Sequence, residues 1–324
     1  MNKRERVTAA FQGKEVDHVP VCFWRHFSPD TERGEDIVDV HLKFLRETDE
    51  DFLKLQSDGF FGYPVKTLKE LEKPEDLFHI EAISENDPFI RGQIERAKAI
   101  TKRVDGEVIT MYTLFCPLSV FRLQVGWDMM MKCMRENPEA TMHAVDVIAD
   151  VENRLIEGLV KEGGVDGIFL SVQNAELTRF TPAEYEKWVK PGDLKVLNYI
   201  DSIADYNVLH CCGWDADEAG TRNHVGVWKG YPLPVVNWAS YVDQLDASQI
   251  REIFPEKTAW GGFDNRMSAN ALIYTGTEKE VKEETLRLIE KYGKERFMLG
   301  PDCSIQCEID PRRLKWVAEA SRSV

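Results

Sequence analysis

Three residues in the second half of the chain have the types and spacing of a catalytic zinc site. His210 and Cys212 lie two positions apart at the end of a short apolar run, and Cys303 follows a later one. Successive side chains of a strand point to opposite faces, so this histidine and cysteine share a face. One histidine and two thiolates leave the fourth position of a tetrahedral zinc ion open, which is typical of catalytic sites. The alternative interpretation is a core histidine among buried free thiols.

The five other cysteines are given different roles. Cys307 lies four residues after Cys303, so it is either an alternative third ligand or a neighbour of the site. Cys211 is expected to point away from the ligand face because it alternates with Cys212. Cys22, Cys116 and Cys133 have no histidine or cysteine at ligand spacing and are interpreted as packing residues.

Further polar and aromatic residues follow or end the other apolar runs. Asp302, Asp264 and Gln173 are candidate catalytic residues, and Asp302 is expected either to orient His210, to accept a substrate proton, or simply to form a turn. The candidate substrate-binding residues are Arg25, Tyr112, Trp238 and Asn237. Trp24 and Trp127 are expected to pack in core or loop positions.

These residues require a fold that brings the ends of many strands together. Apolar runs typical of strands occupy residues 19–24, 52–56, 107–112, 167–172, 206–210, 234–238, 258–262 and 296–300. Segments with helical periodicity occupy residues 37–47, 88–103, 138–162, 181–203, 247–253 and 278–292. This alternation predicts a single-domain (β/α)8 TIM barrel over residues 1–324, with residues 1–14 as a helical lead-in. A doubly wound sheet is the rival, weakened because no strand precedes a G-x-G-x-x-G turn.

The formal net charge of −15 argues against partners that are themselves anionic. A surface this acidic repels phosphate backbones and anionic lipids, so nucleic-acid and membrane-surface roles are not expected. No apolar stretch reaches the roughly 20 residues that a membrane-spanning helix needs, and no secretion signal is visible at the N-terminus. We therefore expect a cytoplasmic protein, and self-association into a homo-oligomer stays open.

Several longer motifs together resemble the uroporphyrinogen decarboxylase superfamily, whose members are barrels. They include RERVTAAFQGKEVDHVPV at 4–21, YTLFCPLSVFRL at 112–123 and GGVDGIFLSVQNA at 163–175. FTPAEYEKWVKP at 180–191, VLHCCG at 208–213, WGGFDNR at 260–266 and FMLGPDCSI at 297–305 extend the resemblance along nearly the whole chain. The true decarboxylases of this superfamily use no metal and hold a tetrapyrrole with arginine, aspartate, tyrosine and histidine side chains. This chain keeps the first arginine as Arg25 but has Pro29, Pro117 and the turn LGPDC where the second arginine, the tyrosine and the histidine are expected.

The zinc methyltransferase branch of the same superfamily is matched more closely. Its ligand pattern of His-x-Cys, followed by a cysteine after the last strand, falls on His210, Cys212 and Cys303. The resemblance implies a Zn²⁺ enzyme that moves a methyl group between a small methylated substrate, or a thiol acceptor, and a corrinoid carried by a partner protein. The direction of transfer is not specified. A uroporphyrinogen decarboxylase of tetrapyrrole biosynthesis and a non-catalytic barrel homologue are the alternatives.

Overall fold

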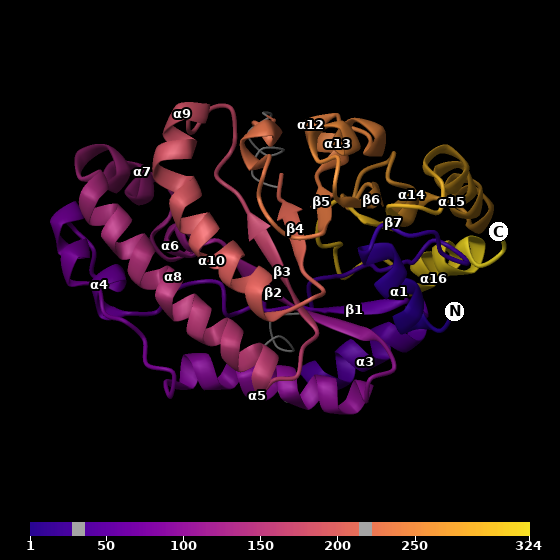
Figure 1. Ribbon diagram of the computed structural model, residues 1–324, viewed down its shortest axis with the longest axis horizontal. Helices are drawn as coiled ribbons and strands as arrows, with labels where there is room; N and C mark the ends of the chain where they lie inside the picture. The colour runs from indigo at the N-terminus through magenta and orange to yellow at the C-terminus, as the bar shows by residue number, and fades with distance from the viewer. Residues whose placement is uncertain (28–35, 214–221) are drawn as a thin grey trace.

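A parallel β-sheet with helices on its outer face forms the framework of the protein, seen here in a computed structural model (Figure 1) that describes residues 1–27, 36–213 and 222–324. Seven strands follow one another in sequence order across the sheet. They are β1 Phe52–Leu55, β2 Ile109–Phe115, β3 Gly167–Val172, β4 Val208–Cys211, β5 Val235–Trp238, β6 Thr258–Phe263 and β7 Phe297–Pro301. Parallel strands need crossover connections, which the helices between them supply.

The six helical segments expected from the sequence form close to their predicted bounds, and further helices, such as Pro117–Val125, Trp127–Glu136 and Pro311–Ser321, were not expected. The longer ones are α1 Lys3–Phe11, α3 Ile37–Thr48, α5 Pro88–Val104, α6 Pro117–Val125, α7 Trp127–Glu136, α8 Pro138–Lys161, α10 Lys190–Ile203, α13 Ala247–Ile253, α15 Glu278–Tyr292 and α16 Pro311–Ser321. The short ones are α4 Lys66–Lys69, η1 Pro74–His79, α9 Pro182–Glu184, η2 Tyr185–Val189, η3 Val225–Trp228, α12 Ser240–Asp243 and α14 Leu272–Thr275. Side chains cap two of these helices, since Asn137 accepts from the Ala140 amide and Thr181 exchanges hydrogen bonds with Glu184.

The segment expected as the first of eight strands, residues 19–24, is not a regular strand. It pairs only through isolated parallel bridges, Val21 with Leu299 of β7 and Arg25 with Ile305. On its other side, the Val21 amide donates to the carboxylate of Asp51 at 2.9 Å, where a regular ladder would use a backbone carbonyl. The prediction of eight regular strands is therefore corrected to seven, forming a curved parallel sheet.

The inner face of the curved sheet encloses a second apolar cluster, distinct from the one beneath the outer helices. Side chains from the strands meet there with Val7, Ala10 and Phe11 of α1. The Thr258 hydroxyl at the start of β6 donates to the Ala10 carbonyl at 2.7 Å. The predicted helical lead-in thus covers the amino ends of the strands and leaves their carboxyl ends available for a site.

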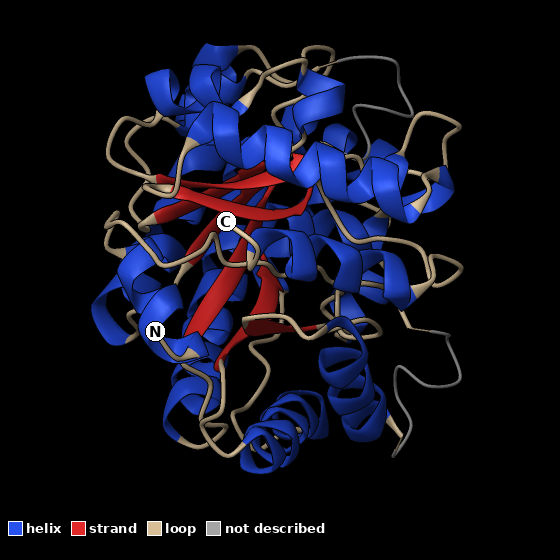
Figure 2. Ribbon diagram, turned by 90° about the vertical axis from the view of Figure 1, so that its right-hand side faces the viewer, coloured by secondary structure: helices blue, strands red, loops and turns tan. Residues whose placement is uncertain are grey.

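Helices lie around the outside of the sheet (Figure 2). Contacts run from α3 to α5, from α5 to α8 and from α8 to α10, and α16 contacts both α15 and α3. The last helix therefore packs against one of the first. Among the described residues, none of the helices combines the length and the apolar character that crossing a membrane requires.

Candidate metal centre and cavity

A cavity of about 410 Å³ lies at the carboxyl ends of the strands. Its wall contains four aromatic rings, from Trp24, Phe61, Phe115 and Phe169. The remaining described residues of the wall are His26, Lys54, Gln56, Thr113, Leu123, Ser171, Gln173, His210, Cys212, Gly213, Ala239, Val242, Asn265, Arg266, Cys303, Ser304 and Gln306. Apolar atoms form most of the surface of the wall, and many of its residues add a polar group, a combination that suits a small-molecule site.

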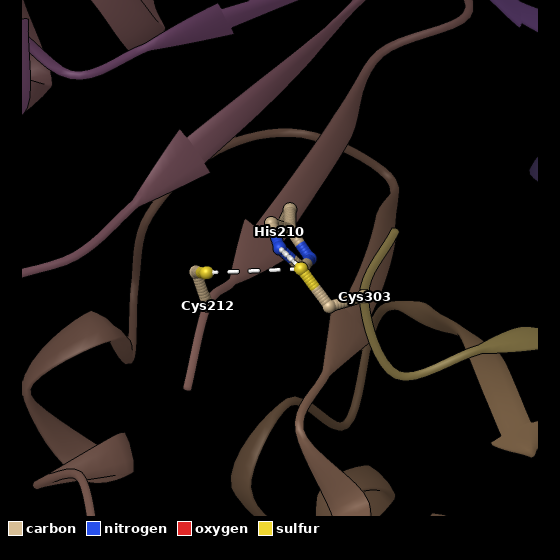
Figure 3. A group of neighbouring side chains, drawn as sticks. All are labelled: His210, Cys212 and Cys303. Atoms are coloured by element: carbon tan, nitrogen blue, oxygen red, sulfur yellow. Dashed lines mark hydrogen bonds between the residues drawn. The ribbon is translucent and has the colours of Figure 1, made fainter. Parts of the chain in front are cut away.

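The three residues with metal-ligand spacing converge on one side of this cavity (Figure 3). The sulfur of Cys303 lies 4.0 Å from the sulfur of Cys212 and 3.6 Å from Nε2 of His210. Ligands at tetrahedral zinc distances of about 2.3 Å for sulfur and about 2.0–2.1 Å for nitrogen would be separated by about 3.8 Å and about 3.6 Å. The side chains therefore fit a zinc ion in both element type and spacing.

The strand register explains this convergence. His210 lies on β4 and is buried, and Cys212 directly follows the strand on the same face. Cys211 lies between them and packs into the apolar cluster under the outer helices, as its alternation predicts. Cys303 follows β7, whereas Cys307 is exposed and its thiol contacts Glu308. Cys303 is thus the thiol that joins the cluster.

Asn237 holds the imidazole of His210 in the tautomer that a metal ligand needs. The two residues are register partners on β4 and β5, and Nδ1 of His210 bonds to Oδ1 of Asn237. The amide nitrogen of Asn237 donates to the carbonyls of Trp260 at 2.8 Å and Pro301 at 2.9 Å, so its oxygen must face the imidazole. The amide oxygen can only accept, hence Nδ1 carries the proton and Nε2 presents its lone pair to the cluster.

The two thiols of the cluster disfavour each other's ionisation. The hydrogen bond with Cys212 and burial raise the pKa of Cys303 well above its usual value. Two neighbouring thiolates become stable only when a cation compensates their charge, and a coordinated thiol is deprotonated by its metal. The donor set therefore favours a divalent, thiophilic ion over a site that functions through free thiols.

Lys54 is a residue of the cavity wall that the sequence analysis did not identify. It is only 3% exposed, and its ammonium lies 4.5 Å from the ring centre of Phe169 and 5.1 Å from that of Trp24. It donates to the amide oxygen of Gln56 at 2.7 Å. Burial lowers the pKa of Lys54 to about 7. The signal in the sequence is a lysine between Leu53 and Leu55, inside a strand that is otherwise apolar.

A hydrogen-bonded chain continues from Lys54 to the mouth of the cavity. The amide nitrogen of Gln56 donates to Oδ1 of Asp58 at 2.9 Å, and the other carboxylate oxygen of Asp58 lies 2.9 Å from Nδ1 of His26. The side chain of His26 is 42% exposed, whereas that of Asp58 is buried. Asp58 therefore orients a histidine that reaches both the cavity and solvent.

The candidate catalytic residues from the sequence occupy different positions. Gln173 lines the cavity and accepts a hydrogen bond from Arg122. Asp264 is paired with Arg266 at 2.9 Å. Asp302 accepts from the Ser240 hydroxyl at 2.7 Å and the Tyr241 amide at 2.9 Å. Neither aspartate is among the wall residues.

The expectation that Asp302 orients the histidine ligand is not met. Its carboxylate bonds to the start of α12, and Asn237 makes the bond to the imidazole instead. Burial raises the pKa of Asp302 to about 8. Its role as a turn and cap residue agrees with these contacts.

None of the four candidate substrate-binding residues is among the wall residues, and Asn237 supports His210 instead. The Tyr112 hydroxyl bonds to Gln93 at 3.2 Å and Arg96 at 2.8 Å on α5, because its position in β2 faces the outer helices. Trp238 faces outward too and donates to the Leu245 carbonyl. Arg25 donates to the Cys307 carbonyl at 2.7 Å, and Pro29 lies outside the described residues.

Comparisons with known proteins agree with this architecture. The family model described as uroporphyrinogen decarboxylase (URO-D) matches residues 61–324. A methyltransferase from Methanosarcina mazei superimposes with a TM-score of 0.77 at 15% identity, covering 100% of this chain and 99% of that one. The putative vitamin-B12 independent methionine synthase from Listeria monocytogenes gives a TM-score of 0.53 at 11% identity, covering 90% and 86%. Likeness at such identities shows the fold alone. A comparison with curated proteins finds no match.

Proposed function

The chain belongs to the uroporphyrinogen decarboxylase family, and within it we propose a zinc-dependent methyltransferase that moves a methyl group between a small substrate and a corrinoid protein. The observation that carries the proposal is the cluster of His210, Cys212 and Cys303 at the wall of the cavity. The fold shared with the Methanosarcina mazei methyltransferase supports it. The corrinoid partner rests on the resemblance of the ligand pattern to the zinc methyltransferase branch.

The three residues of the cluster would hold a zinc ion, which is the Lewis acid, and would leave one of its four coordination positions open. Bound there, zinc would polarise the heteroatom that carries the methyl group, or lower the pKa of an acceptor thiol. Two thiolates and a neutral imidazole balance the charge of a divalent ion, so the site would gain no net charge that attracts competing anions. Asn237 accepts a hydrogen bond from Nδ1 of the imidazole, so Nε2, 3.6 Å from the Cys303 sulfur, is the nitrogen that faces the cluster.

The rest of the cavity would exclude water and orient the substrate. Trp24 and Phe169 supply apolar surface beside the imidazole of His210, and Phe115 adds a further ring to the wall. A site with little water strengthens each electrostatic interaction with the reacting atoms. Gln173 and Lys54 supply polar hydrogens at the wall, and they would position the heteroatom end of the substrate.

The test is metal content and methyl transfer in two cysteine variants that differ only in position after β7. Purified protein is analysed for zinc and then incubated anaerobically with methylcobalamin and a small thiol, while the cobalamin spectrum is followed. We expect about one zinc per chain and thiol methylation in the wild type, and loss of both in Cys303→Ser. Cys307→Ser is the matched control, since its thiol is exposed and outside the cluster. Zinc retained by Cys303→Ser, or metal-independent turnover, would refute the proposal.

A further inference from the structure

Basic side chains line the cavity of a protein that is acidic overall. The chain carries a formal charge of −15. Yet the described part of the wall contains Lys54, Arg266 and His26 and neither an aspartate nor a glutamate. A cavity lined by one sign of charge raises the local concentration of ligands of the opposite sign. The wall is therefore suited to an anion, in a molecule whose overall charge repels anions.

Two of these three residues already have an acidic partner. Arg266 is held by Asp264 through Nε at 2.9 Å and Nη2 at 3.0 Å. His26 bonds to Asp58 at 2.9 Å. Neither carboxylate belongs to the cavity wall, so each pair presents its basic member to the interior. A ligand that bound to either of them would have to compete with an existing carboxylate.

Lys54 differs from them because its bonded partner is neutral. Its ammonium donates to the amide oxygen of Gln56, and the rings of Trp24 and Phe169 lie beside it. Asp58 is the carboxylate that most favours the charged form of Lys54, but Asp58 accepts from Gln56 and faces His26. An ammonium has three donor hydrogens, and a buried charge is costly when no opposite charge is hydrogen-bonded to it. The position of Lys54 is thus explained if a bound ligand supplies the counter-charge.

We propose that the cavity selects a small, partly apolar substrate with a negatively charged group, which accepts a hydrogen bond from Lys54 while its apolar part lies against the aromatic wall. The inference rests on the proposed function only in treating this ligand as the methyl-transfer substrate. It makes Lys54 a specificity-determining residue. Among methylated compounds it favours ethers or thioethers that bear an acidic group, and it excludes methylated ammonium ions, whose charge Lys54 would repel.

The test compares three probes with the same ring and different charge: benzoate, benzamide and benzylammonium. Binding is measured by calorimetry on chelator-treated protein, so that a carboxylate cannot gain affinity by binding zinc. We expect benzoate to bind at least about tenfold more tightly than benzamide, or ~1.4 kcal/mol, and benzylammonium to bind most weakly. Lys54→Met should remove the preference for benzoate, and Lys54→Arg should retain part of it.

The matched control is Lys43→Met, which makes the same change of formal charge on the surface of α3, where the lysine side chain is 71% exposed. This variant should keep the full preference for benzoate. Thermal unfolding of each variant shows that loss of binding is not loss of fold. Equal affinity for benzoate and benzamide, tightest binding of benzylammonium, or an unchanged preference in Lys54→Met would overturn the inference.

The outcome is separable from that of the methyl-transfer assay. A Lys54-dependent preference for benzoate in a protein that holds no zinc and transfers no methyl group would leave the anion site standing and refute the proposed function. Zinc-dependent methyl transfer in a protein without that preference would refute the anion site alone.

Discussion

The buried carboxylate of Asp193, which is not part of the metal cluster, is expected to make the stability of the fold depend on pH. This carboxylate on α10 is 1% exposed, and its Oδ2 accepts hydrogen bonds from the hydroxyls of Tyr185 and Tyr231, both at 2.8 Å. The Tyr185 hydroxyl also accepts from the indole of Trp228. Burial outweighs these hydrogen bonds and raises the pKa of Asp193 from 3.8 to about 6. The charged form is therefore less stable in the folded protein than in the unfolded chain.

The pKa gives both the size and the pH range of the effect. A rise from 3.8 to about 6 corresponds to about 3 kcal/mol, at about 1.4 kcal/mol for each factor of ten in the ionisation constant. Between these pH values the folded protein binds more protons than the unfolded chain, so the free energy of unfolding falls as the pH rises. The full cost of the carboxylate is present above about pH 6 and disappears below about pH 4.

Asp193→Asn removes the charge and keeps the geometry. Because both tyrosines donate to the same oxygen, an amide oxygen in that position retains both hydrogen bonds. We expect the variant to be more stable than the wild type by about 1–3 kcal/mol at neutral pH, and the gain to vanish near pH 4. Denaturant unfolding across this range measures the difference, and Asp205→Asn on the surface is the control. A loss of stability at neutral pH, or a gain that does not depend on pH, would refute the reasoning.

Three predictions concern the cavity and its metal. Cys212→Ser should lose zinc and methyl transfer, whereas Cys211→Ser, on the opposite face of the strand, should keep both and lose only about 1 kcal/mol of stability. The reverse result would mean that the register of β4 is wrong by one residue. Asn237→Ala should lower zinc affinity by about 10–100-fold, because the imidazole of His210 loses the hydrogen bond that fixes its tautomer. Competition with a chromogenic chelator measures the affinity, and an unchanged value would contradict the supporting role of Asn237. We expect that the protein does not decarboxylate uroporphyrinogen. The resemblance matches Arg25 to a substrate-binding arginine, but Arg25 donates to a backbone carbonyl and is not among the residues of the cavity wall. Steady formation of coproporphyrinogen would contradict this prediction.

The fold was largely predictable because the periodicity of the chain is strong. Seven of the expected strands and the six expected helical segments form within a few residues of their predicted bounds, whereas α6, α7 and α16 were not expected. The exception, residues 19–24, is as apolar as the others, and its irregularity comes from Asp51, whose side chain takes the place of a backbone acceptor. The Asp51 carboxylate, thirty positions after Val21, accepts this hydrogen bond in place of a backbone carbonyl, and the local pattern of apolar residues does not reveal such a contact.

The metal ligands were also predictable from the periodicity of the sequence, whereas the aromatic residues of the cavity wall were not. His210 and Cys212 follow from a period of two on one strand. Tyr112 and Trp238 were expected to bind substrate because each ends an apolar run, yet both side chains lie on the outward face of their strands. Position at the end of a strand does not fix the face of a side chain, and in β2 the inward residues are Thr113 and Phe115.

The parallel register also explains why the metal ligands and their support form one unit. Ser171, His210 and Asn237 are register partners on β3, β4 and β5, so they lie at one level on the inner face. Asn237 in turn bonds to the carbonyls of Trp260 on β6 and Pro301 at the end of β7, just before Cys303. The orientation of the histidine thus depends on four adjacent strands whose hydrogen bonds are those of the sheet itself. A change that shifts any of these strands moves one ligand relative to another, so the fold fixes the geometry of the cluster before a metal binds. Zinc affinity should therefore respond to substitutions in β5 and β6 that contact no ligand.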